Sequence, residues 1–152
     1  MKLTQIAKVA LAEAKKAKKN KETPIGAVVF NKDKIISKAY NMVISRKNPI
    51  AHAEVLALQK ASKKLMTENL MDYNLYVTLE PCSMCSHIIS KFKIGTLYFG
   101  AYDTKKGSIE NGERIFSNST GGIYIPEIFG GIAAKESRDL LNSFFLELRK
   151  KS

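Results

Sequence analysis

Strand-like and helix-like segments alternate along this chain, and their order restricts the fold more than any other feature. Runs rich in apolar, β-branched and aromatic residues predict five strands, at residues 25–30, 35–40, 74–79, 94–100 and 123–129. Apolar residues at helical spacing predict four helices, at residues 2–18, 52–64, 81–92 and 135–150. Strands that alternate with helices need crossover connections, which cover both faces of a mostly parallel sheet. We therefore expect an α/β fold: a three-layer α/β/α sandwich with a mostly parallel five-stranded sheet, whose first two strands form a hairpin.

Length and composition fit a single domain over residues 1–152. No run of about 18 apolar residues is present and the N-terminus lacks an apolar signal block, so we expect no membrane segment and a cytoplasmic location. The formal net charge is +11. Such an excess favours a polyanionic partner, either nucleic acid or an acidic membrane surface. A compositional bias toward lysine would explain the same charge, so the excess supports nucleic-acid binding without deciding it.

The only two cysteines form a Cys-x-x-Cys motif, Cys82 and Cys85, which is typical of either a redox pair or half of a metal site. Residues three apart on a helix share one face, so both thiols can point at one ion. His52 opens the second predicted helix and supplies an imidazole. One imidazole and two thiolates leave the fourth tetrahedral position of zinc to water, which is the pattern of a catalytic site. We predict that His52, Cys82 and Cys85 bind one Zn²⁺ per chain.

Glu54 is the predicted catalytic residue. Positions two apart within a helix differ by about 200° of rotation, so His52 and Glu54 can share one site only if His52 lies at the helix start. Zinc lowers the pKa of its water ligand from about 15.7 to about 7. Glu54 beside that water would pass its proton to a leaving amine, which describes a hydrolytic deamination. The other histidine, His87, follows Cys85 by two residues and is expected to point elsewhere.

Several stretches of the chain match one enzyme family. They are Thr23-Pro24-Ile25-Gly26-Ala27-Val28, Asn41, Ala51-His52-Ala53-Glu54, the segment 75–85 with its Pro81-Cys82-Ser83-Met84-Cys85 motif, and Phe99-Gly100-Ala101-Tyr102-Asp103. H-x-E followed by P-C-x-x-C is the known signature of zinc nucleobase deaminases. Together these stretches closely resemble the bacterial tRNA-specific adenosine deaminases. The resemblance implies a cytidine-deaminase-like fold, a homodimer, and conversion of adenosine to inosine at the wobble position of a tRNA anticodon stem-loop.

The resemblance also implies contacts with the substrate. By position, Asn41 would hydrogen-bond the flipped base, and the backbone around Ile25, Ala27 and Val28 would line its pocket. Asp103 would contact the target nucleotide or its neighbour. Two structural alternatives stay open at this point, because Asn41 could simply end a strand and Asp103 could cap a turn.

One segment departs from the family pattern. Family members often carry histidine before the last strand, in a stretch that grips the anticodon loop, whereas residues 117–125 here contain none. Lys105, Lys106 and Arg114 are the alternative candidates for phosphate contacts. The departure concerns the contacts with RNA and leaves the metal motif unchanged.

Three other functions compete with an RNA-editing deaminase. A free nucleobase or nucleoside deaminase, such as a cytosine or guanine deaminase, would share the metal motif, although His52 argues against the small cytidine deaminases, which use cysteine there. A non-catalytic RNA-binding module could keep the metal for stability alone. A redox pair would use Cys82 and Cys85 without a metal.

Overall fold

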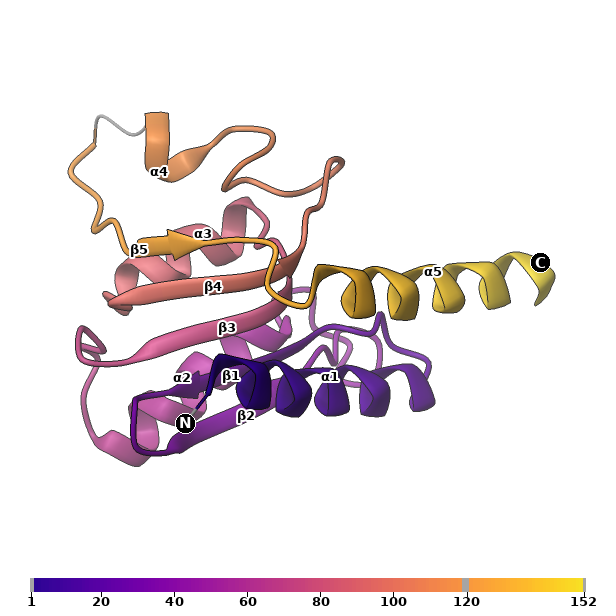
Figure 1. The fold of residues 1–152 in the computed structure, drawn as a ribbon, viewed down its shortest axis with the longest axis horizontal. Coiled ribbons are helices and arrows are strands. Elements are labelled where there is room, and N and C mark those ends of the chain that lie inside the picture. Colours follow the sequence, from indigo (N-terminus) through magenta and orange to yellow (C-terminus); the bar gives the residue numbers. More distant parts are fainter. Residues whose placement is uncertain (1, 119–120, 152) are drawn as a thin grey trace.

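The computed structural model describes residues 2–118 and 121–151 and places a five-stranded sheet between two layers of helices (Figure 1). The strands follow the order β2-β1-β3-β4-β5 across the sheet. Their bounds are β1 Gly26–Phe30, β2 Ile35–Tyr40, β3 Asn74–Leu79, β4 Thr96–Ala101 and β5 Glu127–Phe129. The predicted α/β sandwich is confirmed, and β2 and β3 have the predicted bounds. The last strand is shorter than the predicted 123–129.

The sheet is mixed, which corrects the expectation that it is mostly parallel. β1 pairs antiparallel with both β2 and β3, whereas the pairs β3–β4 and β4–β5 are parallel. The physical reason is the position of the first crossover. The helix after β2 reverses the chain, so β3 runs parallel to β2. However, β3 does not pair with β2. It lies on the other side of β1 and pairs with that strand, which runs in the opposite direction.

Two helices cover each face of the sheet, and they pack on alternate residues of the central strands. The helices are α1 Leu3–Lys19, α2 Ala53–Leu65, α3 Ser83–Lys91, α4 Ile115–Asn118 and α5 Ala134–Lys151. Val28 and Tyr76 face α1, in a cluster with Ile6 and Ala10. Ala27, Leu75 and Val77 face α2 and α3 instead. This period of two is what pleated strands require when both faces are covered. The short α4 lies in a segment for which the sequence predicted no helix.

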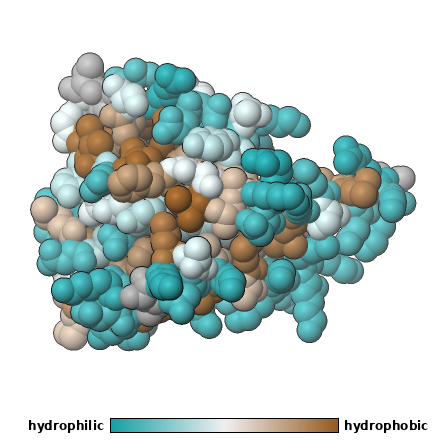
Figure 2. Space-filling view, viewed as in Figure 1, coloured by the Kyte–Doolittle hydropathy of each residue, from teal (hydrophilic) through white to brown (hydrophobic). Residues whose placement is uncertain are grey.

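The final helix is less buried than its pattern predicts. The spacing of Leu140, Leu141, Phe144, Phe145 and Leu148 places them on one face of the helix, yet only Leu141 and Phe144 are buried. The helix runs past the edge of the sheet beside α1 (Figure 1). Figure 2 shows hydrophilic side chains over much of the outer surface of both helices, with hydrophobic ones between them. Lys18 joins the two helices through a 3.0 Å hydrogen bond to Ser143.

Glu22 is a buried carboxylate that holds the loop between β2 and α2. It follows α1 and is completely excluded from solvent. Its two oxygens accept hydrogen bonds from the backbone N–H groups of Ile44 at 3.0 Å and Ser45 at 2.6 Å. Burial alone would raise the pKa of Glu22, but these donors outweigh it and hold the pKa below its usual range. The loop is therefore fixed to the end of α1.

Among the described residues, every helix is too short or too polar to cross a lipid bilayer.

Replacing Glu22 with Gln should destabilise the protein by about 1–3 kcal/mol at neutral pH, because buried N–H groups lose their charged acceptor. The difference from wild type should shrink as the pH falls below about 4.3, the pKa of an unfolded glutamate. A carboxyl whose folded pKa is depressed stabilises the protein above its unfolded pKa and loses that effect as it is protonated. Urea unfolding of both proteins across a pH series measures this. A difference that stays constant from pH 7 to pH 3 would contradict the assignment.

Candidate active site

The three predicted ligands lie at the first turns of two helices. His52 is the N-cap of α2, with extended backbone angles (φ −74°, ψ 152°), and Glu54 lies in the first turn. Cys82 is the N-cap of α3 in a similar conformation (φ −75°, ψ 174°). The prediction that His52 lies at a helix start is confirmed. Because the cap residue is not yet helical, His52 and Glu54 can face the same site despite their spacing of two.

The fold brings the ligand side chains together from two elements. His52 Nδ1 lies 3.8 Å from Cys82 Sγ and 3.4 Å from Cys85 Sγ. All three ligand atoms lie within 4.8 Å of one another, and they form the only group of this kind among the residues that the structure describes. In a tetrahedral zinc site, ordinary Zn–N and Zn–S bond lengths place such N and S atoms about 3.6 Å apart. The residues therefore fit a single tetrahedral metal ion with one position left for a small ligand.

The two thiols are electrostatically unequal, as expected for neighbouring acids in one site. Cys85 donates a hydrogen bond that lowers the pKa of Cys82 to about 4, and His52 contributes in the same direction. The same contact and burial raise the pKa of Cys85. The hydrogen bond with Cys82 also raises the pKa of His52, while burial of the imidazole opposes that rise. A lowered thiol pKa is found in redox pairs and in metal sites alike. The convergence of the His52 imidazole on both thiols is what favours a metal site over a redox pair.

Glu54 lies beside the ligands but is a separate group. Its side chain is buried, with the residue 4% exposed. Burial raises the pKa of Glu54, whereas the neighbouring His52 opposes the shift. A carboxyl that is excluded from water and close to a metal-bound reactant can accept a proton and return it, which is the behaviour required of a general acid–base group.

The structure separates the predicted substrate residues into two groups. Asn41 directly follows β2 and is buried; its backbone N–H donates to Ile25 O at 3.1 Å. Ala27 packs in the cluster that contains Ala51 and Ala53, on either side of His52. Val28 is fully buried under α1 and paired on both sides by β2 and β3. Met42, the residue after Asn41, donates its backbone N–H to Ala51 O at 2.9 Å, which joins this end of β2 to the residue before His52. Val28 faces the opposite side of the sheet.

Asp103 and the basic residues lie on the loop after β4. Asp103 Oδ1 accepts hydrogen bonds from the backbone N–H groups of Lys105 and Lys106, each at 3.0 Å, so Asp103 caps a turn. The side chains of Lys105 and Lys106 are exposed. Arg114 Nε donates to Glu110 O at 3.1 Å. Contact between Asp103 and a nucleotide stays a prediction. In the segment 117–125, Ser119 and Thr120 lie outside the described residues.

His87 is exposed on α3 and is absent from the ligand group, as predicted.

Sequence reasoning assigned no role to Glu80, which the structure places at the end of β3 with 2% exposure. Burial alone would raise its pKa, but N–H donors from the loop after β4 outweigh burial and hold the pKa below its usual range. The only signal in the sequence was an acidic residue between an apolar strand and Pro81, next to the first cysteine.

Comparisons with known proteins agree with this geometry. Residues 1–101 match the family described as the cytidine and deoxycytidylate deaminase zinc-binding region. A tRNA-specific adenosine deaminase from Rickettsia bellii (strain RML369-C) is 41% identical over 142 residues, which cover 92% of this chain and 97% of that protein. The tRNA-specific adenosine deaminase of Bacillus subtilis (strain 168) is 39% identical over 149 residues, covering 95% and 89%.

Solved structures show the same fold. A structure from studies of A-to-I editing by tRNA:A34 deaminases at the wobble position of transfer RNA has a TM-score of 0.87 and 39% identity, covering 90% of this chain and 99% of that one. A guanine deaminase from Nitrosomonas europaea has a TM-score of 0.82 at 21% identity, covering 94% and 84%, and shares the fold. The chain belongs to the tRNA-specific adenosine deaminases, hydrolytic enzymes of the zinc-binding cytidine and deoxycytidylate deaminase family.

Proposed function

We propose that the protein converts adenosine to inosine at the wobble position of a tRNA anticodon stem-loop. The observation that carries this proposal is the convergence of His52, Cys82 and Cys85 from two helix starts, with the Glu54 carboxyl buried beside them. A metal-binding group with an adjacent buried carboxyl is suited to activate water. The proposed substrate is inferred from the relatives at about 40% identity, which are named as tRNA-specific adenosine deaminases.

We propose that the metal is one Zn²⁺ per chain, held by His52 Nδ1 and the thiolates of Cys82 and Cys85. When bound, zinc supplies a water molecule of lowered pKa at neutral pH. An all-nitrogen-and-sulfur donor set with three members is typical of catalytic zinc and unlike the oxygen ligands that magnesium and calcium prefer.

Glu54 moves the protons of the reaction. Hydrolysis adds the oxygen of water to the ring carbon that bears the amino group, breaks the bond from that carbon to nitrogen, and releases ammonia. One proton of the water ends on the ring nitrogen and the other on the departing ammonia. Glu54 accepts a proton as the oxygen adds and returns it as the bond to nitrogen breaks. Its burial limits exchange of that proton with bulk water.

The proposed substrate contacts come from the start of β1, the residue after β2 and the loop after β4. Asn41 would hydrogen-bond the base, the backbone around Ile25 and Ala27 would line its pocket, and Asp103 would contact the target nucleotide or its neighbour. A net charge of +11 favours a polyanionic substrate over a free base. The similarity to a guanine deaminase at 21% identity concerns the fold alone, so it does not favour a free purine. A homodimer, a cytoplasmic location and a single domain over residues 1–152 stay predictions.

Metal analysis tests the proposed ligands. Dialysed wild-type protein should carry about one zinc per chain, and His52→Ala, Cys82→Ala and Cys85→Ala should each lose most of it, because three ligands are the fewest that a catalytic site uses. His87→Ala is the matched control and should retain zinc. A folded wild-type protein that purifies without zinc would favour the redox pair instead.

Replacing Glu54 with Gln or Ala should abolish turnover while zinc content and circular dichroism stay unchanged. Loss of a general acid–base group typically costs at least about 10²-fold in rate. Single-turnover deamination by variants with measured zinc content provides the comparison. Undiminished turnover in Glu54→Ala would rule out the proton transfer assigned to Glu54, and absence of turnover in wild type on any substrate would favour a binding module.

The substrate class is tested by incubating the protein with an anticodon stem-loop RNA that has adenosine at the wobble position. Free adenine, cytosine, cytidine and guanine serve as parallel substrates. We expect inosine to form in the RNA only, with the rate falling as salt rises, because RNA binding releases counterions. Activity confined to free bases would establish a nucleobase deaminase instead.

A further inference from the structure

Glu80 sits between the metal-binding cysteines and the loop after β4, here called the 103–111 loop. It directly follows β3, and its backbone N–H donates to Ala101 O at 2.8 Å, which continues the pairing with β4. The residue is only 2% exposed. A carboxylate in such a position must satisfy both oxygens within the protein.

Five N–H groups of the 103–111 loop converge on that carboxylate. Oε1 accepts from the backbone of Asp103 at 3.0 Å and from Asn111 Nδ2 at 2.7 Å. Oε2 accepts from the backbone N–H groups of Ile109, Glu110 and Asn111, at 3.0, 2.9 and 3.1 Å. The donors come from both ends of the loop, so one side chain closes it into a ring.

The closed loop packs directly on the metal-binding segment. Ser108 donates to Pro81 O through its backbone N–H at 3.0 Å and its hydroxyl at 3.1 Å. Gly107 forms a β-bridge with Cys82, and a Cβ atom at Gly107 would lie 2.5 Å from Glu80 Cδ. No side chain fits between the loop and the carboxylate. The hydrogen bonds to Glu80, together with those of Ser108 and the Gly107 bridge, therefore hold the loop against Cys82.

The loop carries two neighbouring lysines beside the metal-binding segment, and its one exposed acidic residue, Glu110, lies four residues further along the chain. Lys105 and Lys106 are exposed, and their backbone N–H groups are held by Asp103. Lys106 directly precedes Gly107, which forms the β-bridge with Cys82, so the lysine pair lies next to a metal-binding cysteine. Two ammonium groups beside a site that receives a nucleotide are placed to meet its phosphates.

We propose that Glu80 is a positioning residue for substrate binding: it holds the 103–111 loop so that Lys105 and Lys106 meet the substrate's phosphates at the edge of the metal site. The inference rests on the proposed RNA substrate. It separates two tasks, since His52, Cys82, Cys85 and Glu54 carry the chemistry whereas Glu80 acts through the loop.

The test is the steady-state deamination of the anticodon stem-loop RNA by Glu80→Gln. We expect KM to rise by at least about tenfold, while kcat and zinc content stay within about threefold of wild type. The lysine contacts bind the substrate and the transition state equally, so their loss weakens binding without slowing the chemical step. The dependence of log binding constant on log salt should become shallower by about 1.4, the value for two phosphate contacts to single-stranded RNA.

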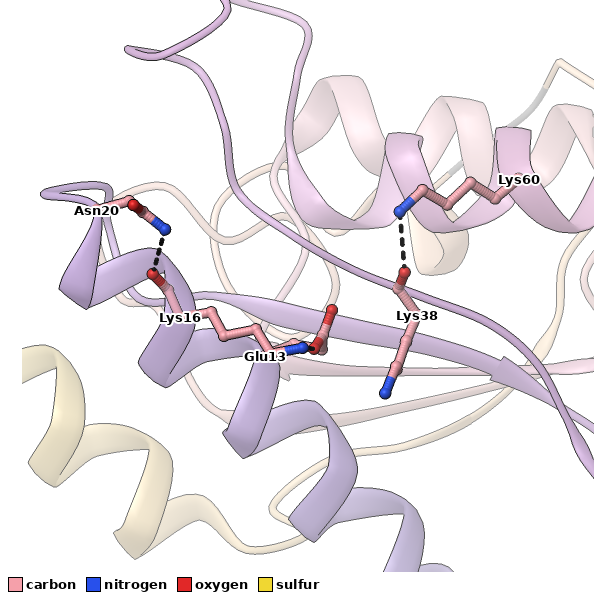
Figure 3. Close-up of polar contacts among 5 residues, drawn as sticks. All are labelled: Glu13, Lys16, Asn20, Lys38 and Lys60. Atoms are coloured by element: carbon pink, nitrogen blue, oxygen red, sulfur yellow. Dashed lines mark hydrogen bonds and ion pairs between the residues drawn. The ribbon is translucent and has the colours of Figure 1, made fainter.

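Three further variants keep the test independent of stability. Asn111→Ala removes a single donor to Glu80 and should raise KM in the same direction but less. Glu13→Gln is the matched control, a buried glutamate on α1 whose partner is Lys16 at 2.7 Å (Figure 3). It should leave KM and the salt dependence unchanged. The double variant Lys105→Ala/Lys106→Ala should have a higher KM than wild type. Adding the same two substitutions to Glu80→Gln should raise KM little further, because the loss of Glu80 and the loss of the lysines remove the same contacts with the substrate.

The outcomes are distinguishable. If wild type does not deaminate the RNA, the proposed function fails. If wild type is active but Glu80→Gln behaves as Glu13→Gln does, or loses kcat with KM unchanged, the positioning role of Glu80 is wrong and the proposed function stands.

Discussion

The whole site depends on two helices that begin at the same edge of the sheet. β2 and β3 are both antiparallel to β1, so they run in the same direction and their carboxyl ends meet at one edge. The helices that follow them, α2 and α3, start there with His52 and Cys82 as their caps. Cap residues have extended backbone angles and still stand beside the first helical turn. Without these two starts, the imidazole, the two thiols and Glu54 would not share one site.

Helix starts also suit the chemistry of the ligands. The unpaired N–H groups and the dipole at a helix N-terminus favour negative charge nearby, which supports the thiolate form of Cys82, whose pKa is lowered. Glu54 experiences a different balance, because its burial disfavours the ionised form and raises its pKa. A thiolate that can bind a metal and a carboxyl that holds a proton are two groups that hydrolytic deamination needs. Both arise from the same edge of the fold.

Two buried carboxylates fix the loops around that edge. Glu22 binds the loop that precedes α2, and Glu80 binds the loop that follows β4. The oxygens of each carboxylate accept hydrogen bonds from backbone N–H groups. They take the place of the carbonyl acceptors that a helix or sheet would supply, which these irregular segments lack. Loops that carry functional residues are often mobile, but here charged hydrogen bonds in a buried setting restrain them. The residues proposed for the chemistry are at the helix starts, and these two glutamates hold the loops next to those helices.

The sequence by itself determined the local features. Apolar spacing set the helices and the bounds of β2 and β3, and the spacing of His52, Glu54, Cys82 and Cys85 predicted both the metal ligands and a helix start at His52. These are short-range properties, because periodicity and caps depend on residues within one or two turns. The resemblance to a deaminase family required several such stretches together.

Only the tertiary structure decided the rest. The antiparallel placement of β3 beside β1, the burial of Val28 under α1 and the exposure of Phe145 depend on which elements become neighbours, and local patterns carry no such information. Glu80 shows this most clearly. In the sequence it is one acidic residue beside Pro81, and its five donors lie 23 to 31 residues further along the chain. The folded backbone determines which N–H groups reach a buried carboxylate, and the function that we propose for Glu80 depends on those partners.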